Sequence, residues 1–473
     1  MAFDRMCAGH TRGIRPGDRV LVVGMGRSGQ AAASLLLGEG AYPLLADDDG
    51  GKLRHPVVEA LIAAGAAVAE ADAVAAVSLV VSSPGVPPAH PLLTAARERG
   101  IPVWGELELA SRSCRAPLLA VTGSDGKSTT CAMMAHLIAT AGREVVLGGN
   151  IGTPLSSLVS SLPCNGLAVV EVSSYQLETT ESFRPWVAGL LNVEPDHLER
   201  HGSLDAYARA KARIFGRQGP GDWAVINGDR AGLGALVPAA GATVLEFSTR
   251  RSIPAGACLM EGWLTHVWRG ERQRILRAGD LPVPGHHNVE NALAALTMVL
   301  PLELRPEHLA VGLSSFRALP HRLEPVGTVA GVDFVNDSKA TNVHSAAAGL
   351  ASMERPVVLL VGGKDKGLSF APLAEAARNR ARMAFAYGEA GVRLAEALAL
   401  AVPAERVVDL VAAVHAAARS ARPGDVVLLS PACSSFDAYG SFEQRGEHFR
   451  ELVMALPGYA PVGHQESPKK SSR

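Results

Sequence analysis

The chain has 473 residues, of which 48% are hydrophobic and 19% charged, so it can form about three domains and is not intrinsically disordered. Its 45 basic and 46 acidic residues leave a formal net charge of −1, which argues against nucleic acid or an anionic membrane as a partner. Scattered cysteines, a charged N-terminus and no apolar run of membrane-spanning length predict a soluble cytoplasmic protein, expected to be a monomer.

The first predicted strand, RVLVVG, runs into the glycine-rich turn GMGRSG (24–29), which opens a predicted helix. The next predicted strand ends in an acidic run about 20 residues further on, as in dinucleotide-binding folds. A pyrophosphate would then lie on the helix N-terminus. A tight turn without a ligand would show the same pattern, and no nearby hydride-transfer site favours a nicotinamide. The residues that could contact such a ligand are Gly26, Arg27, Ser28, Asp47 and Asp48.

A second turn, TGSDGKST (122–129), follows the apolar run APLLAV and is more specific for a nucleotide triphosphate. Lys127 would supply a positive charge to the terminal phosphates, and Ser128 a hydroxyl for magnesium. The alternative is a solvated Gly–Lys turn. Because a carboxylate aimed at phosphate would repel it, the side chain of Asp125 is expected to face away.

Three residues further along the chain extend this predicted site. Glu171 ends the predicted strand LAVVEV, where ligands of parallel sheets bind, so it is a candidate magnesium ligand. An N-cap or a solvated loop acid is an equally common role. His197 follows a strand in NVEPDH, and Lys211 lies on the next predicted helix. Each alone would be structural or solvated, but their occurrence together after a phosphate loop favours a functional cluster.

Short apolar strands alternate with Ala-rich helical segments along the chain, which predicts an α/β fold with parallel sheets. The SRSCRAP linker and the segment near 318 suggest domains at 1–112, 113–318 and 319–473. The polar tail at 463–473 is expected to be disordered.

Eight motifs occur in the order found in the Mur ligases, which this sequence resembles from GMGRSG to SFEQRG (441–446). They are TGSDGKST, GGNIG (148–152), EVSSYQLE (171–178), NVEPDH with a downstream ARAK, GHHNVENALAA (285–295), LPHRLE (319–324), NDSKATN (336–342) and SPACSSFD (430–437). LPHRLE, SPACSSFD and the lack of a DNPR motif favour the members that add D-glutamate.

The resemblance implies an N-terminal Rossmann-like domain for a UDP-sugar, a central P-loop-type ATPase domain and a C-terminal Rossmann-like domain for an amino acid. It implies ATP-dependent ligation of D-glutamate to UDP-N-acetylmuramoyl-L-alanine through an acyl phosphate, in peptidoglycan precursor synthesis. The implied cofactors are ATP, a pair of Mg²⁺ ions and a lysine carbamoylated by CO₂. The first glycine turn would accordingly hold the UDP diphosphate, and the second would hold ATP.

The family pattern also implies residue roles. UDP-sugar contacts are implied for Gly26, Arg27, Ser28, Asp47, Asp48, Gly85, Asn150, Ser173 and His197. ATP contacts are implied for Gly123, Ser124, Asp125, Gly126, Lys127, Ser128, Thr129, Asn288, Asn291, Arg322 and Asp337. D-glutamate contacts are implied for Lys339, Thr341, Lys366, Ser435, Phe436 and Phe442, although plain core packing is the alternative for the two phenylalanines. The implied metal ligands are Ser128, Glu171, His197 and carbamoylated Lys211, and the catalytic residues are Lys127, His197 and Lys211.

Other functions remain open at this stage. Another Mur-type or a folylpolyglutamate synthase-like amide ligase would share the central ATPase domain, but the UDP-type first domain and LPHRLE argue against the latter. A dinucleotide-dependent oxidoreductase would rest on GMGRSG alone. A non-catalytic nucleotide-binding regulator would need the turns but not Lys211, His197 and Lys366. In place of Asp125 the family usually has Asn, so the contact of that residue is the least defined.

Overall fold

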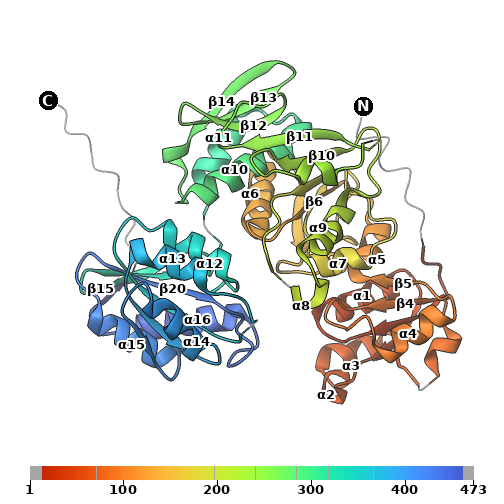
Figure 1. The fold of residues 1–473 in the computed structure, drawn as a ribbon. Helices are drawn as coiled ribbons and strands as arrows, with labels where there is room; N and C mark the ends of the chain where they lie inside the picture. The colour runs from red at the N-terminus through yellow and green to blue at the C-terminus, as the bar shows by residue number, and fades with distance from the viewer. Residues whose placement is uncertain are drawn as a thin grey trace. The chain divides into compact units, whose positions relative to one another are not determined.

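The computed structural model describes residues 13–461 except 71, 197, 240, 284, 318 and 366 (Figure 1). His197, Lys366 and the predicted disordered tail therefore lie outside the described residues. The chain divides into two compact units. The first runs to Pro282 and includes Asn288–Phe316, and the second contains Val283–His287 and the chain from Arg317 onward.

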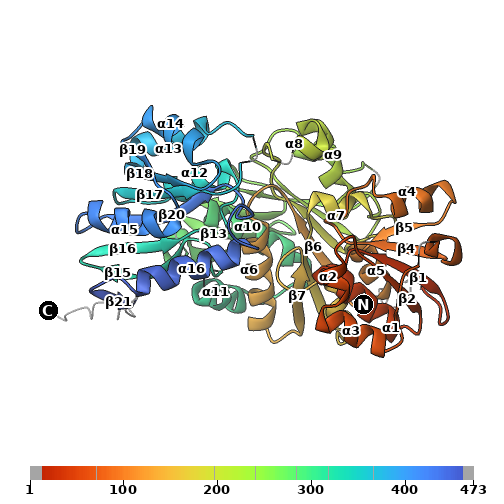
Figure 2. The same cartoon turned by 90° about the horizontal axis from the view of Figure 1, so that it is seen from below.

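The first unit begins with a five-stranded parallel sheet in the order β3-β2-β1-β4-β5. Its strands are β1 (Arg19–Val23), β2 (Tyr42–Ala46), β3 (Ala67–Val68), β4 (Leu79–Ser82) and β5 (Val103–Gly105). Its helices are α1 (Arg27–Gly38), α2 (Gly50–Leu53), α3 (Pro56–Ala63), α4 (Pro91–Glu98) and α5 (Glu106–Ser113). Apolar residues of α1, α3 and α5 pack on one face and those of α4 on the other, as Figure 2 shows for α1, α3 and α4. This covering of both faces explains why β1 is apolar along its length.

A nine-stranded sheet follows in the same unit, in the order β14-β13-β12-β11-β10-β9-β6-β8-β7. The strands are β6 (Leu118–Thr122), β7 (Val145–Gly149), β8 (Leu167–Glu171), β9 (Val187–Leu190), β10 (Trp223–Asn227), β11 (Thr243–Ser248), β12 (Gly256–Met260), β13 (Trp263–Trp268) and β14 (Glu271–Arg277). The helices are α6 (Lys127–Thr140), α7 (Ser174–Glu178), α8 (Leu198–His201), α9 (Leu204–Ala212), α10 (His286–Val299) and α11 (Pro306–Ser315). Strands β12, β13 and β14 pair antiparallel, an edge that the sequence analysis did not predict.

One hydrophobic core joins the two sheets of the first unit. Leu107 on α5 belongs to the same buried cluster as Val20 of β1, Leu155 and Leu177. The short helix η3 (Leu155–Ser157) contributes Leu155 to this core. Helix α5 is thus shared between the N-terminal sheet and the nine-stranded part, and its position is fixed by apolar packing on both.

The second unit contains a seven-stranded sheet in the order β19-β18-β17-β20-β16-β15-β21. Its strands are β15 (Glu324–Val329), β16 (Val332–Asn336), β17 (Val357–Gly362), β18 (Ala381–Tyr387), β19 (Ala404–Arg406), β20 (Val426–Ala432) and β21 (Tyr459–Pro461). Its helices are α12 (Val343–Ala351), α13 (Ala371–Arg380), α14 (Gly391–Ala399), α15 (Leu410–Ser420) and α16 (Phe442–Met454). Helices α12, α13 and α14 cover one face and α15 and α16 the other, so the predicted α/β fold is confirmed, with antiparallel pairing at β15.

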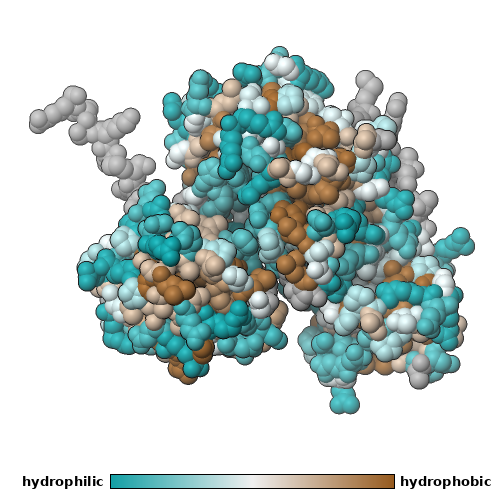
Figure 3. Space-filling model, in the orientation of Figure 1, coloured by the Kyte–Doolittle hydropathy of each residue, from teal (hydrophilic) through white to brown (hydrophobic). Residues whose placement is uncertain are grey.

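None of the helices among the described residues is both long and apolar enough to cross a membrane. Hydrophilic and hydrophobic residues are interspersed over the face drawn in Figure 3.

Candidate active site

The predicted phosphate loop joins β6 to α6, and β6 lies between β9 and β8 in the nine-stranded sheet. Gly126 has φ +82°, and a Cβ there would lie 2.3 Å from Oδ1 of Asn291, so only glycine fits. Helix α6 begins at Lys127 without a side-chain cap on its first N–H groups. Backbone N–H groups at a helix N-terminus attract anions, so this turn is suited to phosphate.

Asn192, which the sequence analysis missed, fixes the first half of the loop. Its Oδ1 accepts hydrogen bonds from the backbone N–H of Ser124 and of Asp125, both at 2.9 Å. The Oγ of Ser124 also donates to the carbonyl of Glu194 at 3.0 Å. The only sequence signal for Asn192 is its place directly after the buried strand β9 in NVEPDH.

The structure brings Lys127 and Lys211 together on one carbonyl group. The Nζ of Lys127 donates to the carbonyls of Gly123 and Ser124 at 2.8 and 2.6 Å. The Nζ of Lys211 donates to the same Gly123 carbonyl at 2.7 Å and lies 4.2 Å from the ring centroid of Tyr207. Lys211 is 1% exposed, so its amine has almost no contact with solvent.

Burial, and then the charge of Lys127, hold the pKa of Lys211 well below its usual value. The carboxylates of Asp196, Asp125 and Glu171 act in the opposite direction. Desolvation disfavours the ammonium form, so the neutral, nucleophilic amine of Lys211 is populated at lower pH than that of an exposed lysine. Asp125 is thus close enough to influence this cluster electrostatically, while its orientation relative to a phosphate stays a prediction.

Glu171 ends β8 and is 3% exposed. Its Oε1 accepts a hydrogen bond from Nδ2 of Asn150 at 2.8 Å. Ser128, also 3% exposed, lies on the first turn of α6. A hydroxyl and a carboxylate are hard oxygen donors of the kind that Mg²⁺ prefers. Among the described residues, which exclude His197, the His, Cys, Asp and Glu side chains alone form no group of three suited to a metal.

The two predicted adenine contacts lie beside the phosphate loop. Asn288 and Asn291 are 4% and 6% exposed on α10, and Nδ2 of Asn291 donates to Oδ1 of Asn288 at 3.2 Å. The Oγ1 of Thr130 lies 3.4 Å from Oδ1 of Asn291. The asparagine pair is therefore connected to α6 within the same unit.

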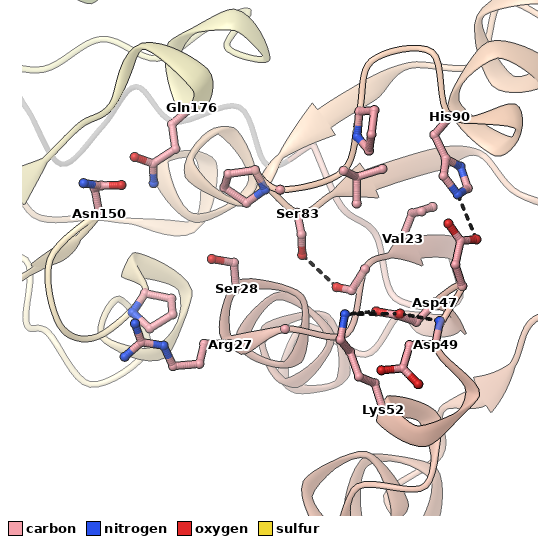
Figure 4. A pocket seen from close by; sticks show the side chains of 18 of the residues that line it. Val23, Arg27, Ser28, Asp47, Asp49, Lys52, Ser83, His90, Asn150 and Gln176 are labelled. Atoms are coloured by element: carbon pink, nitrogen blue, oxygen red, sulfur yellow. Dashed lines mark hydrogen bonds and ion pairs between the residues drawn. The ribbon is translucent and has the colours of Figure 1, made fainter. Parts of the chain in front are cut away.

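The first glycine turn borders a pocket of ≈ 550 Å³ (Figure 4). The residues predicted to contact UDP that line it are Gly26, Arg27, Ser28, Asp47, Asp48, Gly85 and Asn150. Ser173 is absent from the lining; instead it caps α7 in a capping box with Gln176. Lining residues that the sequence analysis missed include Asp49, Lys52, Ser83, His90 and Gln176; among them, Asp49 belongs to the acidic run after β2 and Gln176 to EVSSYQLE.

The two predicted acids of this pocket have different environments. Asp47 accepts hydrogen bonds from the backbone N–H of Met25 at 2.6 Å and of Asp49 at 2.9 Å, and Lys52 lies 3.4 Å away. Burial raises the pKa of Asp47, but these hydrogen bonds and Lys52 outweigh it, so the net pKa is lowered. Asp48 is 88% exposed in its side chain and pairs with His90 at 3.2 Å. Asp47 therefore stabilises the glycine turn, and Asp48 is the more accessible acid.

The predicted amino-acid site lies at strand ends of the second unit. Lys339 and Thr341 follow β16, and Lys339 Nζ lies 5.2 Å from the ring centroid of Phe442. Ser435 is 2% exposed after β20. Phe436 is 66% exposed, so the alternative of core packing is wrong for this residue. Phe442 is partly buried at the start of α16.

Arg445, also missed from the sequence, links three of these strand ends. It is fully buried, and its guanidinium donates to Ser338 Oγ and O at 3.0 and 2.9 Å. It also donates to the carbonyls of Gly362 at 3.3 Å and Cys433 at 3.1 Å. Ser338 and Cys433 follow β16 and β20, and Gly362 ends β17, so a single cation holds the backbone of the predicted amino-acid site.

Two residues predicted to complete the ATP site belong to the second unit. Asp337 is 4% exposed and accepts a hydrogen bond from Ser430 Oγ at 2.8 Å. Its other oxygen lies 3.3 Å from the backbone N of Leu323. Arg322 precedes Leu323 and is partly buried. Their action on a nucleotide stays a prediction.

A phosphate loop after β6 of one sheet and a separate pocket at the glycine turn of another define a multidomain α/β nucleotide-binding protein. Residues 18–105 match the Mur ligase MurD-like N-terminal domain, 121–299 the Mur ligase middle domain, and 321–433 the Mur ligase glutamate ligase domain. The chain belongs to the Mur ligase family, as the resemblance implied.

Similar proteins agree with this assignment. A UDP-N-acetylmuramoylalanine–D-glutamate ligase of Pelotomaculum thermopropionicum is 42% identical over 448 residues, covering 93% of this chain and 98% of the relative. Another of the same name, from Anaeromyxobacter dehalogenans, is 43% identical and covers 92% and 97%. The solved structure of UDP-N-acetylmuramate–alanine ligase from Thermotoga maritima has a TM-score of 0.59 at 21% identity, covering 92% of this chain and 99% of that one. This structural likeness supports the three-domain fold.

Proposed function

We propose that this chain catalyses ATP-dependent ligation of D-glutamate to UDP-N-acetylmuramoyl-L-alanine, a cytoplasmic step in peptidoglycan precursor synthesis. The observation that carries the proposal is the match to ligases of that name over 93% of the chain. The structure supports it with two separate sites in one unit, the phosphate loop and the pocket at the first glycine turn. Two such sites suit a reaction that uses both ATP and a UDP-sugar.

Each proposed domain contributes one substrate site. Residues 1–112 bind the UDP-sugar, 113–318 bind ATP, and 319–473 bind D-glutamate. The matched domain ranges, 18–105, 121–299 and 321–433, each fall within one of these segments. The proposed D-glutamate contacts are Lys339, Thr341, Lys366, Ser435, Phe436 and Phe442.

The reaction has two steps, because a carboxylate is a poor electrophile. A carboxylate oxygen of UDP-N-acetylmuramoyl-L-alanine attacks the γ-phosphorus of ATP, and the bond to ADP breaks. The amine of D-glutamate then attacks the acyl carbon, loses a proton, and phosphate leaves as the amide forms. Lys127 places its positive charge beside the transferred phosphoryl group, and holding the reactants in contact can lower the barrier by about 7–11 kcal/mol.

Magnesium is the metal implied by the family, and Ser128, Glu171, His197 and Lys211 would hold it. When bound, it would neutralise negative charge on the phosphates. Lys211 would serve as a ligand after its amine adds to CO₂ and releases a proton, which gives a carbamate. The low pKa of Lys211, caused first by burial, supports this modification because only the neutral amine can attack CO₂.

Phosphate release from ATP tests the proposal directly. With UDP-N-acetylmuramoyl-L-alanine present, D-glutamate should stimulate release, and a panel of other amino acids should not. L-glutamate should be a poor acceptor, because inversion at Cα prevents its amine and both carboxylates from reaching their partners together. Efficient use of L-glutamate, or of an amino acid without a side-chain carboxylate, would leave only the broader class of amide ligase.

Lys366→Ala is expected to raise the KM for D-glutamate about 10- to 100-fold and to leave the KM for ATP nearly unchanged. The proposed role of Lys366 is to bind the side-chain carboxylate, and a hydrogen bond between charged groups contributes about 1.5–3 kcal/mol. Steady-state kinetics with each substrate varied in turn would measure both values. Lys364, exposed and two positions earlier, provides the matched control. A larger D-glutamate effect in Lys364→Ala would show that the wrong lysine was assigned.

A further inference from the structure

The segment from the end of β7 to η3, in the nine-stranded part of the first unit, forms a wall of the UDP-sugar pocket. Gly149, Asn150, Gly152 and Pro154 of this segment line the pocket opposite the residues contributed by the N-terminal sheet. In Figure 4, Asn150 and Gln176 lie on one side of the pocket, and Asp47, Lys52 and His90 on the other. The width of the pocket therefore depends on where the segment 149–157 is held.

The beginning of this segment is fixed at the end of β8. The backbone N of Asn150 donates to the carbonyl of Glu171 at 2.8 Å, and its Nδ2 donates to Oε1 of the same residue. Gly149 has φ +99°, and a Cβ there would lie 2.4 Å from the Glu171 carbonyl. The segment thus starts in close contact with a residue proposed to bind magnesium.

The far end of the segment is held by Glu106 of α5. The backbone N–H of Ser156 donates to Oε1 of Glu106 at 2.7 Å. Glu106 is 1% exposed, and its Oε2 is buried without a hydrogen-bond partner among the described residues. Burial raises the pKa of this carboxyl, although hydrogen bonds from Ser156 act against it. Burying a carboxyl at the edge of an apolar core is unfavourable. Packing alone therefore does not explain why a glutamate occupies position 106.

We propose that Glu106 is a positioning residue that holds the segment 149–157 against the UDP-sugar pocket. The inference rests on the proposed function, because it takes a UDP-sugar as the ligand of that pocket. Leu155 fixes the depth of η3 through the apolar core, and the hydrogen bond from Ser156 to Glu106 fixes its rotation. Asn150 then meets both the pocket and Glu171, which connects the sugar substrate to the phosphate-transfer site.

Glu108 lies on the same helix and serves as a control. Comparing it with Glu106 separates a role in positioning the pocket wall from simple attachment of one domain to another. It is also fully buried and accepts hydrogen bonds from the backbone N–H groups of Glu181, Ser182 and Phe183. It pairs with Arg112 at 2.7 Å as well. None of residues 181–183 lines the pocket, so Glu108 contacts the same part of the protein without touching the substrate wall.

Isothermal titration of the intact chain with uridine 5′-diphosphate tests the proposal through three variants. Glu106→Met removes the acceptor but keeps the volume, so it should raise the Kd about tenfold, which corresponds to one lost hydrogen bond. Glu106→Gln retains an acceptor for Ser156 and should remain within about threefold of the wild type. Glu108→Gln should lower the Tm without changing the Kd. Glu106→Met leaves the buried N–H of Ser156 without its acceptor, so its Tm should also fall, and each Kd is therefore measured well below the Tm of the variant.

Hydrogen exchange provides a second measurement that does not depend on the affinity. In Glu106→Met, the amides of 149–157 should exchange faster, whereas those of 181–183 should not change. Wild-type affinity in Glu106→Met, or an equal loss in Glu108→Gln, would overturn the positioning role. Failure of the wild-type chain to bind uridine 5′-diphosphate would instead count against the proposed function.

Discussion

Lys127→Ala is expected to reduce ligation by at least about 1,000-fold while leaving the Kd for uridine 5′-diphosphate nearly unchanged. Lys127 opens α6, and its Nζ lies on the carbonyls of Gly123 and Ser124 within the phosphate loop. Removing it deletes the positive charge nearest to the proposed γ-phosphate. The pocket at the first glycine turn is lined by other residues, so UDP binding should persist.

Single-turnover phosphate transfer and titration with uridine 5′-diphosphate would measure the two effects of Lys127→Ala separately. Lys52→Ala is the reciprocal control, because Lys52 lines the UDP pocket and lies outside the phosphate loop. It should weaken UDP binding and leave the KM for ATP nearly unchanged. If Lys127→Ala loses UDP affinity as severely as activity, the assignment of one nucleotide to each glycine turn is wrong.

Lys211→Ala is expected to be nearly inactive, and acetate or another short carboxylate should restore part of the rate. The buried amine of Lys211 contacts the Gly123 carbonyl, and its low pKa favours the neutral form that adds CO₂. Without the carbamate, the proposed magnesium site loses an oxygen ligand. An added carboxylate can supply that oxygen, because Mg²⁺ prefers such donors.

Activity measured over a range of acetate concentrations would test this role of Lys211. Lys127→Ala is the matched control, because acetate cannot replace a lost positive charge and should give no recovery. Full activity in Lys211→Ala would exclude the proposed ligand role. Recovery of both variants by acetate would show that the effect is not specific to position 211.

Local patterns in the sequence predicted the turns well, because each turn is defined by residues adjacent in the chain. TGSDGKST joins a buried strand to a helix, and GMGRSG borders the pocket that contains most of the predicted UDP contacts. The pattern could not separate Asp47 from Asp48. The folded turn distinguishes them, because the carboxylate of Asp47 accepts hydrogen bonds from the backbone N–H groups of Met25 and Asp49.

Long-range contacts were beyond the reach of the sequence. Asn192 lies 68 positions from Ser124, and Glu106 lies 50 positions from Ser156, so neither pair has a local signature. Nothing in the stretch ELELASRS marks its first two glutamates as buried, because charged residues are seldom fully buried. The backbone N–H groups that donate to Glu106 and Glu108 come from other segments of the chain.

The buried guanidinium of Arg445 limits how the amino-acid site can diverge. Its N–H groups point in fixed directions and reach backbone carbonyls of Ser338, Gly362 and Cys433 at the ends of three separate strands. A shift of any one strand end would move its carbonyl out of reach, and the other two would lose their common support. Side chains that project from the loops beyond these carbonyls carry no such restriction. Evolution can therefore exchange the groups that select an amino acid at this end of the sheet, while the relative positions of the three strand ends stay constrained.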